Sequence, residues 1–232
     1  MSLDLSPLDW QAFRLTLWVA VCSTALGGPV ALLTAHILAR GRFWGHGALN
    51  VLVHLPLVLP PVVTGYLLLL TFGRRGAMGQ GLEQVFGLVL SFRWTGAVLA
   101  AMIMAFPLMV RPMRQAIEAL NPQIAVMATS LGATPVQVWR RVTLPMILPG
   151  IVVGAVMGFA KALGEFGATI TFVASIPGQT QTLASAIHAY LSVPGAEIQA
   201  LRLVALSVAL SVLALWGAEV LGRRAARRIA GG

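Results

Sequence analysis

The sequence predicts an all-α polytopic membrane protein with five transmembrane helices and a cytoplasmic helix–turn–helix coupling loop. Of its 232 residues, 58% are hydrophobic and only 10% are charged, and the mean hydropathy is +0.86. A soluble domain of this size carries far more charge. Several apolar runs exceed about 18 residues, the length at which a helix can cross a bilayer. No internal repeat or separate soluble domain is visible, so residues 1–232 are expected to form a single membrane domain.

The apolar runs place the spans along the chain. The first follows Ser6 and Pro7, which have the form of a serine cap with proline at the first helical position. The second contains Pro56, Pro60 and Pro61, and prolines inside a span kink it, either for packing or for gating. The expected spans are residues 13–38, 49–72, 94–110, 149–172 and 201–221.

Two segments between the spans are too short to cross a membrane. Residues 82–92 are apolar and are expected to lie at the interface or to re-enter the bilayer. Residues 183–192, within a polar loop, are expected to form a short helix.

The positive charges predict the orientation. The chain has a net charge of +9, but its cations gather in a few loops and the tail, which is typical of membrane orientation rather than of nucleic-acid binding. An outside N-terminus and a cytoplasmic C-terminus put ten arginines inside and three outside, as the positive-inside rule requires. The ten are Arg40, Arg42, Arg111, Arg114, Arg140, Arg141, Arg223, Arg224, Arg227 and Arg228; the three are Arg74, Arg75 and Arg93.

Residues 121–150, here called the elbow, are the longest stretch in which polar residues interrupt the apolar sequence. They form most of the expected coupling loop, 115–148. Asn121 and Pro122 can start one helix, and Thr134 and Pro135 can start a second. Gly132 fits the position just beyond a helix end, where φ is usually positive.

The first elbow helix is expected to carry an apolar face formed by Ile124, Met127, Ala128 and Leu131. The second is expected to run through Trp139 toward Leu144 and to end at Pro145 and Pro149, before the next span. An elbow with an apolar face between two spans indicates a docking surface for a partner on the cytoplasmic side.

The chain shows no catalytic motif. Its histidines are isolated and no serine lies in a G-x-S-x-G turn, so neither a zinc protease nor a serine hydrolase is indicated. Lys161 is the only lysine and follows Ala160, which excludes a G-K-[ST] phosphate loop. We therefore expect no catalytic residue, metal ligand or cofactor in this chain, and any ATP-driven work has to come from a partner.

The fourth expected span contains two features. Gly150, Gly154 and Gly158 recur every four residues and form a smooth ridge that lets another helix approach closely, within the bundle, across a homodimer or along a pore. Lys161 and Glu165 stand one turn apart, with Glu165 about 22 Å along the span from its start, in the outer half of the bilayer. They form either a structural ion pair or part of a translocation route.

The elbow resembles the signature of type I ABC importer permeases, which reads Glu-Ala-Ala, three residues, Gly, nine residues, Ile, one residue, Leu-Pro. Here the frame is Val126-Met127-Ala128, then Gly132, then Val142, Thr143, Leu144 and Pro145, with the spacing kept. Valine replaces the glutamate of the signature and methionine the first alanine. Residues 54–67, 73–76, 163–174 and 176–178 are similar to the molybdate permease family, and the similarity extends from about Asp9 to the basic tail.

This resemblance implies a multi-pass inner-membrane subunit that acts as a homodimer. It implies two cytoplasmic ATPase subunits, which hold ATP and Mg²⁺ and dock on the elbows, and a periplasmic protein that delivers molybdate. The residues assigned to ATPase coupling are Ala128, Leu131, Gly132, Ala133, Thr134, Pro135, Trp139, Leu144 and Pro145. A tungstate or sulfate/thiosulfate permease shares the mechanism and is an alternative. A stand-alone channel or carrier is the alternative from another class, and it predicts transport without an ATPase.

Overall fold

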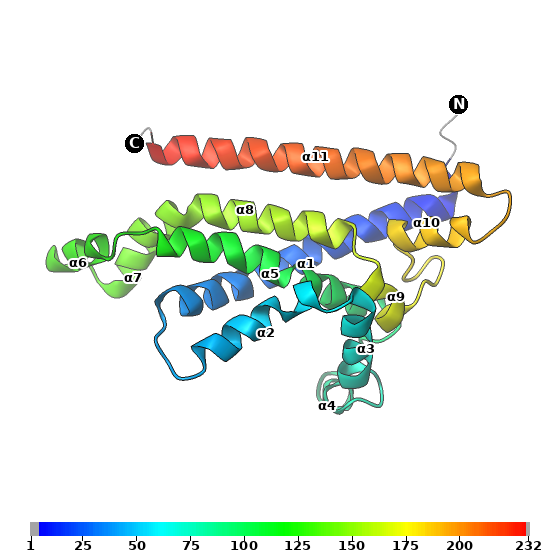
Figure 1. The fold of residues 1–232 in the computed structure, drawn as a ribbon, viewed down its shortest axis with the longest axis horizontal. Helices are drawn as coiled ribbons and strands as arrows, with labels where there is room; N and C mark the ends of the chain where they lie inside the picture. The colour runs from blue at the N-terminus through cyan, green and yellow to red at the C-terminus, as the bar shows by residue number, and fades with distance from the viewer. Residues whose placement is uncertain (1–4, 231–232) are drawn as a thin grey trace.

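The computed structural model describes residues 5–230, with the side chains at 218, 219 and 221–230 left out. The side chains of Arg223, Arg224, Arg227 and Arg228 therefore lie outside the description. Figure 1 shows long helices lying alongside one another, with two shorter helices projecting from one end. The elements are α1 (Pro7–Arg40), α2 (His46–Val58), α3 (Pro61–Phe72), α4 (Ala77–Phe86), α5 (Trp94–Glu118), α6 (Pro122–Ser130), α7 (Pro135–Val138), a π-helical turn (Trp139–Thr143), α8 (Leu144–Leu163), α9 (Gly167–Val173), α10 (Leu183–Leu191) and α11 (Glu197–Ala230).

The predicted all-helical membrane fold is confirmed. Among the described residues, four helical runs are long and apolar enough to cross a bilayer, and the bent pair α2–α3 gives up to five. The four runs are residues 7–40, 94–118, 135–163 and 197–217. Helix α5 packs against both α1 and α8, and α11 packs against α8. The C-terminal ends of α1 and α5 lie at the same end of the molecule as α6 and α7 (Figure 1).

The second expected span is not one kinked helix. Helices α2 and α3 meet at 117°, so the chain turns sharply at Leu59 and Pro60. Helix α2 ends where the Leu59 N–H donates to Leu55 O, and the next two residues, Pro60 and Pro61, have no N–H to continue the helix. Helix α3 then runs across the end of the bundle and packs against α9 (Figure 1).

The fourth expected span also breaks. Helix α8 ends at Leu163, and α9 begins at Gly167 after a three-residue joint, 164–166. Two glycines allow α3 and α9 to cross closely. A Cβ on Gly65 would lie 2.5 Å from Ala168 O, and a Cβ on Gly167 would lie 2.6 Å from Pro61 Cβ. Helices α3 and α9 therefore lie in close contact at these two glycines.

The two short segments between the spans differ in outcome. Helix α10 lies close to the expected 183–192, and Thr182 caps it. Helix α4 begins earlier than the apolar run 82–92 and stops at Gly87, which has a φ of +63°, so most of that run is not helical. Glycine at such a φ ends a helix readily.

The N-terminus of α1 is fastened to α10. The Ser6 hydroxyl accepts from Asp9 N–H, and the Asp9 carboxylate accepts from Ser6 N–H, which confirms the predicted serine cap as a capping box. Tyr190 donates from its hydroxyl to the other Asp9 oxygen at 3.0 Å. Burial is the main cause that raises the pKa of the Tyr190 phenol, and the hydrogen bond to Asp9 raises it further.

The glycine ridge of α8 packs against α5 of the same chain. A Cβ on Gly150 would lie 2.4 Å from Ala116 Cβ, and one on Gly154 would lie 2.7 Å from Met109 O. A Cβ on Gly158 would lie 2.4 Å from the Met109 side chain. These separations are shorter than normal contacts, so α5 and α8 approach each other as closely as small residues permit.

We expect Gly154→Ala to destabilise the bundle by about 1–3 kcal/mol, the usual cost of forcing a core apart. The added methyl meets a backbone carbonyl of α5, which cannot rotate away. Gly28→Ala is the matched control, because a Cβ there meets nothing within 4 Å. Thermal unfolding of the purified protein in detergent measures both variants, and equal midpoints would contradict this account of the ridge.

Candidate functional site

The elbow starts with a short, fully capped helix. The Asn121 side chain accepts from Gln123 N–H at 3.0 Å, and Pro122 occupies the first helical position, as predicted. At the other end, Gly132 N–H donates to Thr129 O and Ala133 N–H donates to Ala128 O, with φ of Gly132 at +87°. These two bonds form a Schellman motif, which needs a residue that tolerates positive φ. The signature residues Ala128 and Gly132 therefore fix the turn of the elbow.

The second helix of the elbow is not separate from the next span, contrary to expectation. Thr134 forms a capping box with Gln137, and Pro135 starts α7. The helix then widens into the π-helical turn 139–143 and continues directly as α8, so residues 135–163 form one helical run. Pro145 is the second residue after this turn, in the first turn of α8, where a wider helical geometry removes the need for its missing N–H. Pro149 lies inside α8 and does not end it.

Four large apolar side chains stand exposed on α6, α7 and the turn between them, and they form what we call the elbow face. Their exposed fractions are 63% for Val126, 63% for Met127, 89% for Leu131 and 65% for Val136. Ile124, which was expected on this face, is half-buried and instead lines a cavity of about 280 Å³ beside α1. Val126 and Val136 were not expected there. The valine at the glutamate position of the signature was the available signal for the first of them.

Trp139 faces the interior rather than the elbow face. Its ring meets the His36 ring edge-on, with centroids 4.9 Å apart, and it packs against the core between α1 and α5. Trp139 is therefore partly buried by contacts within this chain. Leu144 is also half-buried, whereas Pro145 is exposed.

The base of the elbow is tied to α1 and α2 by two arginines. Arg40 donates to Ile117 O and Leu120 O, both at 3.1 Å, at the C-terminal end of α5 where unpaired carbonyls are available. Arg114 pairs with Glu118 at 2.7 Å and donates to the Asn50 side chain at 2.8 Å. The elbow thus emerges from a fixed platform made by three helices.

Lys161 and Glu165 form an ion pair, but not within one continuous helix. Lys161 lies in the last turn of α8, and Glu165 lies in the joint before α9. The other Glu165 oxygen accepts from Ala168 N–H at 3.0 Å, at the positive end of α9. Glu165 is 3% exposed, and Lys161 lies nearer the surface. Their ion pair links the last turn of α8 to the joint that leads into α9.

We expect Lys161→Ala to lower stability by about 1–3 kcal/mol, because it leaves the buried Glu165 carboxylate without its cation. The loss stays below that of a fully buried pair, since Lys161 is partly exposed. Thermal unfolding of Lys161→Ala, Glu165→Gln and the double variant in one cycle measures the coupling. Additive effects would contradict the structural pairing, and unchanged uptake with normal assembly would exclude a role in transport.

Among the described residues, no three His, Cys, Asp or Glu side chains gather closely enough to hold a metal ion.

Comparison with known proteins supplies the family. Residues 27–227 match the family described as "Binding-protein-dependent transport system inner membrane component". The molybdenum transport system permease protein ModB of Escherichia coli (strain K12) is 47% identical over 223 residues, covering 94% of this chain and 97% of the relative. ModB of Haemophilus influenzae is 44% identical, covering 97% and 98%. The sulfate transport system permease protein CysT of Salmonella typhimurium is 33% identical, covering 97% and 81%.

Two solved structures share the fold. A bacterial ABC transporter involved in the import of the acidic polysaccharide alginate gives a TM-score of 0.75 at 20% identity, covering 96% of this chain and 81% of the other. An amino acid ABC transporter crystallised with histidines gives 0.64 at 20% identity, covering 94% of each. Together with the match over residues 27–227, these findings show that the chain belongs to the family of binding-protein-dependent transport system inner membrane components, alongside the molybdenum permeases.

Proposed function

We propose that this chain is the membrane subunit of an ATP-driven importer of molybdate, working as a homodimer. The observation that carries the proposal is the 47% identity with a molybdenum permease over nearly the whole chain, against 33% with a sulfate permease. An oxyanion with two charges cannot enter hydrocarbon without a polar path, because the loss of its hydration costs tens of kcal/mol. A protein-lined route that opens alternately to the two sides meets this need.

In this proposal two partner ATPase subunits dock on the elbow faces and hold the ATP and Mg²⁺, and a periplasmic protein delivers molybdate. Exposed apolar side chains on a segment outside the bilayer support docking, because soluble surfaces of that kind mark protein interfaces. The N-terminus then lies in the periplasm and the elbow in the cytoplasm, as the arginine distribution favours.

The helical run 135–163 supports a mechanical link between docking and gating. A displacement of Pro135 is expected to move α8 as a rigid unit, because the helical run is continuous from Pro135 to Leu163. At the far end, the Lys161–Glu165 pair joins α8 to α9, which packs against α3. Motion of the elbow is thereby transmitted through packed helices to α3 and α9 at the other end of the bundle.

Reconstituted uptake tests the proposal. Proteoliposomes that contain this chain, its ATPase and its binding protein are expected to accumulate molybdate only with ATP. Competition with tungstate and sulfate separates the molybdate importer from tungstate and sulfate/thiosulfate importers. Uptake by the chain alone, without an ATPase, would instead establish a channel or carrier.

A further inference from the structure

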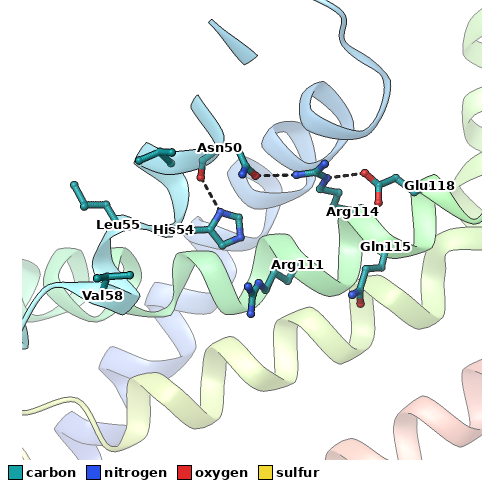
Figure 2. Close-up of a pocket in the computed structure, with 9 residues that line it drawn as sticks. Asn50, His54, Leu55, Val58, Arg111, Arg114, Gln115 and Glu118 are labelled. Carbon is teal, nitrogen blue, oxygen red and sulfur yellow. Dashed lines mark hydrogen bonds and ion pairs between the residues drawn. The ribbon is translucent and has the colours of Figure 1, made fainter. Parts of the chain in front are cut away.

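We propose that the hollow between α2 and α5 is a transient binding station for the transported oxyanion before it enters the cytoplasm. This inference rests on the proposed function. The hollow measures about 630 Å³ and lies at the elbow end of the bundle, since its lining includes Glu118, the last residue of α5. Its polar lining is formed by Asn50, His54, Arg111, Arg114, Gln115 and Glu118 (Figure 2).

The charge of the hollow suits an anion. The lining contains two guanidinium groups and one carboxylate, so it carries a net positive charge, and Val51, Leu55 and Val58 make the rest of the wall apolar. An apolar wall lowers the local dielectric and strengthens the attraction of the arginines for an anion. At about 30 Å³ for each water, the volume leaves room for an anion that keeps part of its hydration shell.

Arg111 is the group that can bind a ligand. Arg114 already uses its Nε on Glu118 and one terminal nitrogen on Asn50. Within the part of the chain that the structure describes, Arg111 forms no hydrogen bond or ion pair, and its side chain is exposed. A free guanidinium fork matches two oxygens of a tetrahedral oxyanion. Gln115, one turn further along α5, offers an amide on the same side of the helix (Figure 2).

The other polar groups hold the wall in place and limit the affinity. His54 Nδ1 lies 2.8 Å from Asn50 O, and since a carbonyl only accepts, Nδ1 carries the proton and the ring is fixed facing α5 (Figure 2). Asn50 in turn accepts from Arg114, which joins α2 to α5 across the hollow. Glu118 neutralises much of the Arg114 charge. A station with one free arginine can attract an anion and still release it, which transit requires.

The test measures molybdate binding to the full chain in nanodiscs of phosphatidylcholine, by equilibrium dialysis and elemental analysis. Arg111→Gln is expected to weaken binding by about tenfold or more, the loss of a charge-assisted hydrogen bond. Arg111→Lys, which keeps the charge, is expected to fall between Arg111→Gln and the parent protein. Arg42→Gln is the matched control, because Arg42 is an exposed arginine at the same end of the molecule and outside the hollow. It is expected to bind like the parent.

Three results of the binding measurements would overturn the inference. The first is the absence of saturable binding by the parent protein, and the second is equal binding by the Gln variants of Arg111 and Arg42. The third comes from discs that contain phosphatidylglycerol: if the lipid stabilises the protein through Arg111 and abolishes molybdate binding, the hollow holds a lipid phosphate. Uptake by the complete transporter distinguishes failure of the binding station from failure of the proposed function. Normal uptake by the parent and by Arg111→Gln overturns the station alone, whereas no uptake by the parent overturns the proposed function.

Discussion

Gly132→Val is expected to abolish coupling between ATP hydrolysis and uptake while the membrane bundle stays folded. The turn after α6 requires a φ of +87°, and a β-branched residue pays about 1–3 kcal/mol there, so the Schellman turn opens. Because a Cβ at this position meets nothing within 4 Å, the effect is one of backbone conformation and not of a clash. We expect uptake to fall by about tenfold or more, measured together with ATPase activity in proteoliposomes.

Gly195→Val is the control for the backbone strain that valine causes at a positive φ. Gly195 has a φ of +85° and equal free space, but it lies before α11 at the opposite end of the bundle. It is expected to lower stability by a similar amount and to leave the ratio of uptake to hydrolysis unchanged. If Gly132→Val couples like the parent protein, or both variants lose coupling equally, the elbow is not the coupling element.

Leu131→Asp is expected to weaken ATPase docking by about 30-fold or more, as for a side chain at the centre of an interface. Leu131 is the most exposed member of the elbow face, at 89%, so water solvates a carboxylate there in the free chain. In the complex it would be buried without a partner, which is expensive. Copurification of the ATPase and a binding titration in detergent measure the loss.

Leu191→Asp is the matched control, because Leu191 is also exposed, at 67%, and lies in α10 at the other end of the molecule. ATPase binding by this variant is expected to equal that of the parent. Cysteine at position 131 adds an independent readout, since its labelling should be blocked when the ATPase is present. Full labelling in the complex would exclude the elbow face from the interface.

Local sequence chemistry predicted much of the elbow correctly. The caps at Asn121 and Thr134 and the positive φ at Gly132 depend on residues within one turn of each other, so their signals survive in any tertiary context. Residues more distant in sequence decided the direction of the side chains. Trp139 and Ile124 turn inward because α1 and α5 offer apolar surface there, which helical periodicity alone does not reveal.

The sequence by itself determined the class of protein and the helix starts after Ser6, Asn121 and Thr134, because hydrophobicity and capping are properties of short segments. Only the tertiary structure decided how sharply the chain turns between helices and what the helices touch. Pro60 and Pro61 interrupt the helix locally, whereas the 117° angle of that turn and the joint between α8 and α9 accompany the close packing of α3 on α9 at Gly65 and Gly167. The hollow beside Arg111 likewise exists only because α2 and α5 are brought together. Asn50 and Arg114, which are 64 positions apart, can share a site only after the chain has folded.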